Sequence, residues 1–87
     1  MPRALVLVNT DVGAEEEVLA DIKNIEGVKN ASLVYGIYDL FIEIEADTIE
    51  KLKDIVTSKI RRIPKVRSTI TMIVVSSNIK NEMSSVQ

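Results

Sequence analysis

The 87-residue chain has no cysteine and no histidine. Without cysteine it forms no disulfide framework and no zinc site built on thiolates. Without histidine it lacks the side chain that most often activates a nucleophile or binds a transition metal. Histidine-based nucleophile activation and typical transition-metal sites are therefore excluded. We predict no catalytic residues, no metal site and no cofactor.

Long apolar runs and an excess of positive charge are also missing. The apolar run at residues 4–8 is too short for the apolar region of a signal peptide, and a membrane span needs about 20 such residues. We therefore expect a cytoplasmic protein without membrane contact. The formal net charge of -2 gives no general attraction to nucleic acid. Any effect on DNA is expected to act through a protein partner.

Aliphatic residues dominate the remaining sequence. Hydrophobic residues make up 46% of the chain, which is typical of a globular domain. Their spacing predicts four strands, at 5–8, 28–35, 40–46 and 66–76, and two helices, at 14–25 and 47–62. Asp47 is expected to cap the second helix. We predict one domain at 1–77, followed by a polar tail at 78–87.

The order β-α-β-β-α-β predicts an α+β, ferredoxin-like sandwich: a four-stranded antiparallel sheet with two helices on one face. The other face of the sheet would then stay uncovered, although the outer strands are apolar on both faces. A contiguous exposed apolar patch is usually an interface. We therefore expect a dimer joined through the open sheet faces, with contributions from Leu5, Phe41, Ile73 and Val75.

The clearest chemical feature is the run at residues 34–40, where a glycine lies between two tyrosines. Glycine at this place indicates a tight reversal between strands, and Asp39 follows where the next strand begins. In one interpretation, Asp39 accepts a hydrogen bond from a ligand ammonium beside Tyr35, Gly36 and Tyr38. In the other, the run is an ordinary hairpin and Asp39 is a turn former.

Hydroxyl groups gather near the start of the final strand, at Ser68, Thr69 and Thr71. They are able to donate hydrogen bonds to a carboxylate or an amide of a ligand. The alternative is that threonine is common in strands for packing reasons. On the residues alone, the second explanation is preferred.

Two charged clusters are candidate sites. The only basic cluster consists of Arg61, Arg62, Lys65 and Arg67. It has no aromatic neighbour of the kind that single-strand nucleic-acid binders use, and complementarity to the helix dipole explains it adequately. The best acid–base or hard-metal candidates are Glu43, Glu45 and Asp47. A solvated strand face is the preferred interpretation of these acids.

Several stretches, taken in order, resemble a known family. They lie at 4–10, 17–18, 27–28, 34–40, 55–60 and 66–71. Together they resemble the effector-binding domain of the Lrp/AsnC (feast/famine) transcriptional regulators, called the RAM domain. The resemblance implies dimers that assemble into rings and bind an amino-acid effector between neighbouring dimers. It also implies that Gly36, Tyr38 and Asp39 line the pocket, with Thr69 and Thr71 opposite.

The sequence departs from the full-length regulators because no helix-turn-helix module precedes the first strand. Direct DNA binding is therefore not expected. The expected partners are copies of the chain itself and full-length Lrp/AsnC-type regulators. Two alternatives stay open: a small dimeric ferredoxin-like enzyme of the monooxygenase or isomerase kind, and a structural adaptor that needs no ligand.

Overall fold

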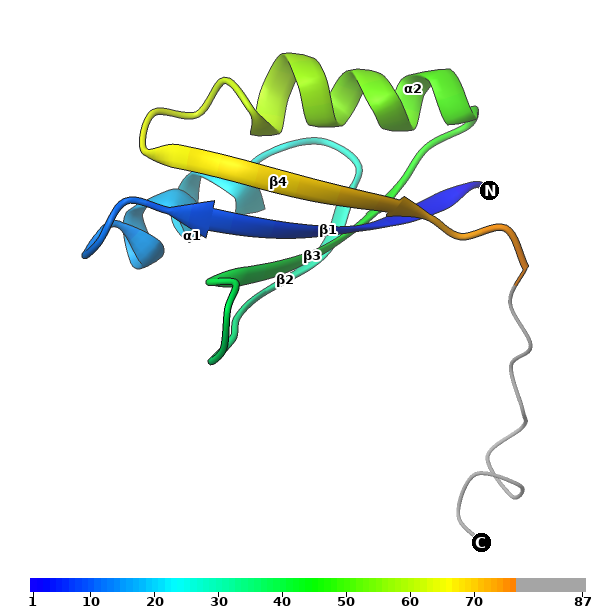
Figure 1. Cartoon of the computed structure of the whole chain (residues 1–87). Helices are drawn as coiled ribbons and strands as arrows, with labels where there is room; N and C mark the ends of the chain where they lie inside the picture. Colours follow the sequence, from blue (N-terminus) through cyan, green and yellow to red (C-terminus); the bar gives the residue numbers. More distant parts are fainter. Residues whose placement is uncertain (77–87) are drawn as a thin grey trace, which may run out of the picture.

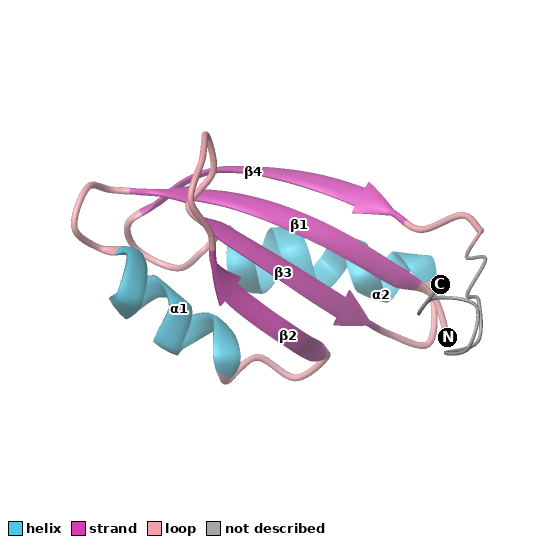
Figure 2. Ribbon diagram, turned by 90° about the horizontal axis from the view of Figure 1, so that it is seen from below, coloured by secondary structure: helices cyan, strands magenta, loops and turns pink. Residues whose placement is uncertain are grey.

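The computed structural model describes residues 1–76 and contains a four-stranded antiparallel sheet with the order β2-β3-β1-β4. The strands are β1 (Arg3–Thr10), β2 (Val28–Leu33), β3 (Leu40–Glu45) and β4 (Val66–Ile73). The helices are α1 (Glu15–Lys23) and α2 (Ile49–Asp54), and α2 continues as the π-helix η1 (Ile55–Ile60). Both helices lie on the same side of the sheet (Figures 1 and 2). The predicted ferredoxin-like fold is confirmed, while the tail predicted at 78–87 lies outside the described residues.

The core lies between the sheet and the two helices. Every second residue of β1 and of β3 faces it, and Val6, Val8 and Ile42 have no exposed surface. The helices contribute Ile22 and Leu52, which are also fully buried. Burying a side chain of this size contributes about 1.5–3 kcal/mol, so this layer supplies most of the stability. Within residues 1–76 no helix is long and apolar enough to cross a membrane.

The opposite face of the sheet carries a second set of apolar side chains. Strand register places Leu5 opposite Met72, and it places Leu7 between Phe41 and Ile70. These five residues form the open-face stripe. Figure 2 shows this face of the sheet with α2 behind it. Since Ile70 and Met72 remain 45% and 43% exposed, the stripe is apolar surface that the chain itself leaves uncovered.

Two of the residues expected on the open face lie elsewhere. Ile73 pairs with the buried Ala4 and packs against the core, so its placement on the open face is wrong. Val75 follows the end of β4 and is 95% exposed. Because β4 is apolar on both faces, alternation alone does not fix its register. The pairing with β1 assigns positions 70 and 72 to the open face instead.

The second helical segment differs from the single helix expected at 47–62. The backbone N–H of Arg61 donates to the carbonyl of Val56 at 2.8 Å, five residues back, which is the π-helical pattern. The Thr57 hydroxyl donates to the Lys53 carbonyl at 2.9 Å. Such a bond from a side chain to the carbonyl four residues back slightly destabilises and bends a helix.

The start of α2 also differs by one residue from the expectation. The cap is Thr48, not Asp47, and its hydroxyl oxygen accepts a hydrogen bond from the Lys51 backbone N–H at 3.1 Å. Thr48 has the extended backbone that an N-cap requires. Asp47 is exposed and precedes the cap.

Gly27 sets the close approach between the sheet and the second helical segment. It has a φ of 100°, and an added Cβ would lie 2.8 Å from Cδ1 of Ile55. The Gly27 carbonyl also accepts from the Glu45 N–H at 2.8 Å. The added Cβ would also lie 3.0 Å from the Glu45 carbonyl oxygen, a backbone atom that yields less readily than the end of the Ile55 side chain. A side chain at this position would therefore crowd β3 as well as strain the backbone.

Candidate functional site

Asp39 joins the β2–β3 hairpin to the end of β1. Its backbone N–H donates to the Val8 carbonyl at 2.9 Å. Its carboxylate Oδ2 accepts from the Thr10 N–H at 2.9 Å and from the Thr10 hydroxyl at 3.4 Å. Oδ1 makes no hydrogen bond within residues 1–76. The carboxylate is therefore held in place by one oxygen and retains acceptor capacity on the other.

The hairpin itself is a six-residue loop at 34–39, not the expected tight reversal. The Val34 N–H closes it by donating to the Asp39 carbonyl at 2.9 Å. Tyr35 and Ile37 are almost fully exposed, at 108% and 87%, whereas Tyr38 is half-buried. The loop thus exposes an aromatic and an aliphatic side chain to solvent a few residues before Asp39.

The predicted hydroxyl groups lie on the other side of β1. Thr69 pairs with Val8 and Thr71 pairs with Val6, so both are on the helix side of the sheet. Ser68 is on the open face, where its Oγ accepts from Asn9 Nδ2 at 3.4 Å. Since β1 separates β3 from β4, these residues are about 10 Å from Asp39, which is two strand spacings. Asp39 and the hydroxyls share one end of the sheet but do not meet in one cavity of a single chain.

The β1–α1 loop is tied to the loop before β4 at the same end. The Asp11 N–H donates to the Lys65 carbonyl at 2.8 Å. Lys65 has a φ of 76°, and its Nζ lies 3.0 Å from Glu17 Oε1. The Arg67 Nε is 4.0 Å from Asp11 Oδ1. These contacts position the first residues of β4.

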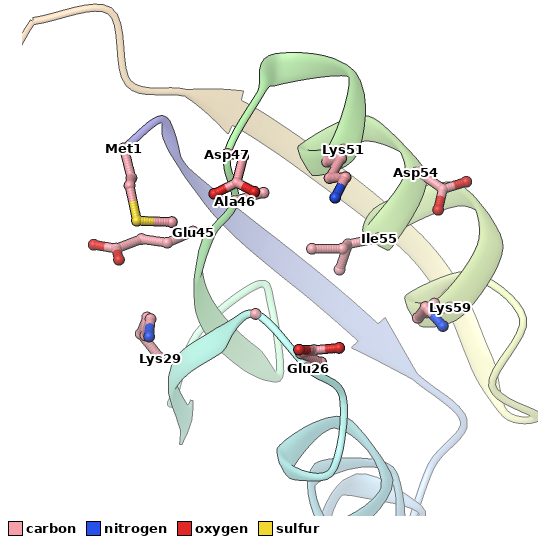
Figure 3. Close-up of a pocket in the computed structure, with 11 residues that line it drawn as sticks. Met1, Glu26, Lys29, Glu45, Ala46, Asp47, Lys51, Asp54, Ile55 and Lys59 are labelled. Carbon is pink, nitrogen blue, oxygen red and sulfur yellow. The ribbon is translucent and has the colours of Figure 1, made fainter.

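A mixed-charge groove of about 380 Å³ lies at the opposite end of the sheet (Figure 3). Lysines and carboxylates alternate around it, and its walls are Met1, Glu26, Gly27, Lys29, Glu45, Ala46, Asp47, Lys51, Asp54, Ile55 and Lys59. Glu43 is not among them, because it accepts from Arg3 Nη1 at 2.8 Å on the open face. The three acids weighed as a metal site are thus divided. No cluster of three or more metal-ligating side chains occurs in residues 1–76.

The comparisons with known proteins place the chain in a family. Residues 3–84 match the model of the Lrp/AsnC ligand binding domain. The chain belongs to this family. It is a family of transcriptional regulators and not of enzymes, which confirms the recognition made from the sequence and the prediction of a non-catalytic protein.

Three similar proteins illustrate the range of the family. An uncharacterized HTH-type transcriptional regulator of Pyrococcus horikoshii is 34% identical over 73 residues, which are 80% of this chain and 49% of the relative. The chain therefore spans about half the length of that curated relative. The solved protein FFRP-DM1 is 40% identical with a TM-score of 0.82, and the match covers 86% of this chain and all (100%) of the other.

The third is a transcriptional regulator of Neisseria meningitidis, solved as a complex with L-Met. It is 13% identical with a TM-score of 0.81, and the match covers 93% of this chain and 54% of the regulator. At this identity the likeness shows the fold alone.

Thr10, the partner of Asp39, is not among the site residues predicted from the sequence. A signal was available, because Thr10 continues the series of inward-facing residues Ala4, Val6 and Val8 as its only polar member. A buried polar group requires a hydrogen-bond partner. The nearest carboxylate that the topology brings to the end of β1 is Asp39.

Proposed function

We propose that this chain is a non-catalytic, cytoplasmic regulatory module that binds an amino acid and acts through oligomerisation. Its partners would be copies of itself and full-length Lrp/AsnC-type regulators. Membership of a family of ligand-binding domains supports the regulatory role. The chain then influences DNA through its assembly and not by contacting an operator.

The open-face stripe supports assembly into dimers. It joins β3, β1 and β4 in a continuous apolar band on the uncovered face. Packing two such faces together would remove this surface from water, which is favourable by about 25 cal/mol for each Å² of apolar area. The Arg3–Glu43 ion pair of 2.8 Å lies beside the stripe on the same face.

The effector site is proposed at the Asp39 end of the sheet, between neighbouring dimers. The observation that carries it is the Asp39 carboxylate, which is fixed through Oδ2 while Oδ1 is available to a ligand ammonium. Tyr35, Gly36 and Tyr38 would form the adjoining wall. Because the hydroxyls of β4 are about 10 Å away within one chain, the residues opposite Asp39 would come from a neighbouring subunit, through Ser68, Thr69 and Thr71.

An amino acid is the proposed ligand class for two reasons. A carboxylate with a free oxygen suits an ammonium, and hydroxyl donors suit a carboxylate. In addition, the Neisseria meningitidis regulator, which has the same fold, was solved with L-Met. Which amino acid this chain prefers depends on how two dimers meet.

The test is a thermal-shift and light-scattering panel of the common amino acids against the wild-type protein and Asp39→Asn. Asparagine keeps an oxygen that is able to accept from the Thr10 N–H, whereas alanine would also remove that structural bond. A ligand at 100 times its dissociation constant adds about 2.7 kcal/mol to stability. We expect a selective shift in the wild type that Asp39→Asn loses. An intact oligomer with no response would instead support the adaptor function.

A further inference from the structure

Methionine supplies the only sulfur atoms of this chain. The sequence contains no cysteine and no tryptophan, and it has three methionines, at positions 1, 72 and 83. A methionine thioether is oxidised to a sulfoxide, a polar group that reductases convert back to the thioether. A reversible response of this chain to an oxidant is therefore expected at a methionine.

Met72 lies within the open-face stripe. It is opposite Leu5 of β1, and Ile70 is the preceding residue of β4 on the same face. Met72 remains 43% exposed in the single chain, so an oxidant reaches its sulfur whenever the open face is free. Met1 precedes β1 and is not part of the stripe. Among residues 1–76, Met72 is thus the only sulfur at the surface through which dimers are proposed to form.

The surroundings of Met72 on the open face suit a thioether and not a sulfoxide. Leu5, Leu7 and Ile70 have aliphatic side chains, which offer no hydrogen-bond donor. The Arg3 guanidinium lies on the same face but already donates to Glu43 at 2.8 Å. A sulfoxide oxygen enclosed between two such faces would be a buried acceptor without a donor, which is costly.

We propose that Met72 is an oxidation-sensitive site, at which conversion of the thioether to the sulfoxide by a peroxide favours separated chains over the dimer. The inference rests on the dimer interface proposed above. In the reaction, the sulfur lone pair attacks one peroxide oxygen and the O–O bond breaks, so sulfur is oxidised by two electrons and the peroxide is reduced. With hydrogen peroxide, the proton of the transferred OH passes to the departing hydroxide, and the products are the sulfoxide and one water molecule.

Dimer formation and oxidation of Met72 then compete for the same surface. In the dimer the facing sheet covers the sulfur, whereas in the separated chain the sulfur is open to the oxidant. Oxidation acts on the separated chains, and the sulfoxide that forms opposes their return to the dimer. A modification that is tolerated better in one state shifts the population toward that state.

The experiment compares the dissociation constant of the dimer before and after oxidation, measured by sedimentation of the full-length chain over a range of concentrations. Dilute protein is treated with hydrogen peroxide, and catalase then removes the excess. Peptide mass spectrometry measures the sulfoxide at each methionine. Met72→Leu keeps an apolar side chain of similar size without sulfur. Met83→Leu is the matched control, since it removes a different thioether of the chain.

We expect oxidation to raise the dissociation constant of the wild-type dimer about tenfold or more, because each chain brings one unpaired sulfoxide oxygen to the interface. Methionine sulfoxide reductase should reverse the change. Met72→Leu should form dimers like the wild type and lose the response to peroxide, whereas Met83→Leu should keep it. Thermal unfolding of dilute protein would check that the oxidised chain remains folded.

The rate of oxidation gives a second, independent measurement. Sulfoxide should form at Met72 more slowly as the protein concentration rises, because dimers cover the sulfur. N-acetylmethionine in the same solution serves as the reference for the strength of the oxidant. Its rate should not depend on the protein concentration.

Three outcomes would overturn the proposal. The first is an unchanged dissociation constant when mass spectrometry shows complete oxidation of Met72. The second is an equal loss of dimers in peroxide-treated Met72→Leu. The third is a rate of oxidation at Met72 that does not depend on protein concentration.

The variant Ile70→Lys separates failure of this inference from failure of the proposed dimer interface. Ile70 lies in the same stripe but carries no sulfur. If the dimer forms elsewhere, neither Ile70→Lys nor oxidation of Met72 weakens it. If the stripe is the interface and only the oxidation effect is absent, Ile70→Lys still weakens the dimer.

Discussion

The two faces of the sheet carry similar apolar side chains, but only one face is covered by helices. On β1, Val6 and Val8 have no exposed surface, while Leu5 and Leu7, their neighbours in sequence, lie on the face that no helix covers. Residue type does not distinguish the two sets. The difference arises because α1 and α2 pack on one side only, so one apolar face stabilises the fold and the other is left for a second molecule.

Adjacent residues of β3 test this comparison most strongly. Ile42 is fully buried, whereas Phe41 is half-buried on the open face. Ile42→Ala should cost about 2–5 kcal/mol, because it opens a cavity in a packed core. Urea unfolding of dilute protein would measure the loss. Phe41→Ala, measured at the same concentration, should cost clearly less. If both variants lost the same free energy of unfolding, the open face would be part of the monomer's core and the proposed difference between the two faces would be wrong.

Gly13 and Gly27 both have a positive φ, but only Gly27 has close neighbours. Substituting each by alanine tests how tightly the helix-covered face of the sheet is packed. Gly27→Ala should destabilise the protein by about 2–4 kcal/mol, because the new Cβ crowds the Glu45 carbonyl oxygen and the Ile55 side chain and the backbone is strained. Gly13→Ala is the control, since Gly13 has a φ of 85° with no atom within 4 Å of its Cβ position. It should cost only the strain, about 1–2 kcal/mol. Thermal or urea unfolding would reveal the difference.

The hydrogen bond between Asp39 and Thr10 lies at the end of β1. Its removal should lower the free energy of unfolding by less than the core substitutions do. Asp39→Ala leaves the Thr10 N–H without its acceptor and should cost about 1–2 kcal/mol. Asp39→Asn should recover much of that stability. Chemical denaturation of both variants without added amino acid would measure the difference. If the two variants were equally stable, the carboxylate would have no structural role.

The smallest effect on unfolding is predicted for the open-face stripe. Ile70→Lys should change the stability of dilute protein by less than about 0.5 kcal/mol, because Ile70 is 45% exposed on an edge strand. It should nevertheless weaken dimers, which sedimentation velocity would detect. Ala20→Lys, at an exposed position of α1 on the other side of the sheet, is the matched control. Unchanged association of Ile70→Lys would contradict an interface at this stripe.

The general fold was predictable because most elements have one clear period. The alternation in β3 and the stripe of α1 both identified the core-facing residues correctly, including Ile42 and Ile22. Where both faces are apolar, the pattern carries no information about register. Ile73 was therefore assigned to the open face, although its pairing with Ala4 places it at the core.

The candidate site was predictable only in part. The run at 34–40 indicated Asp39, but the six-residue loop and the contact with Thr10 depend on how β1 ends beside β3. The sequence also did not reveal that Asp39 and Thr69 lie on opposite sides of β1, because strand order is a property of the assembled sheet. The π-helix was not predicted, because the apolar residues Ile55, Val56 and Ile60 fit the spacing of an ordinary α-helix.

The π-helical turn determines where the second helical segment would tolerate the deletion of one residue. A turn closed by a bond from Arg61 to Val56 contains one more residue than an α-helical turn needs. Deleting one residue there would let the same segment close as an α-helix, and removing a residue anywhere else in the helix would rotate all that follows by about 100°. A one-residue deletion at this turn would therefore leave Arg61 close to its present direction beside β4, whereas a deletion elsewhere in the helix would turn that guanidinium away.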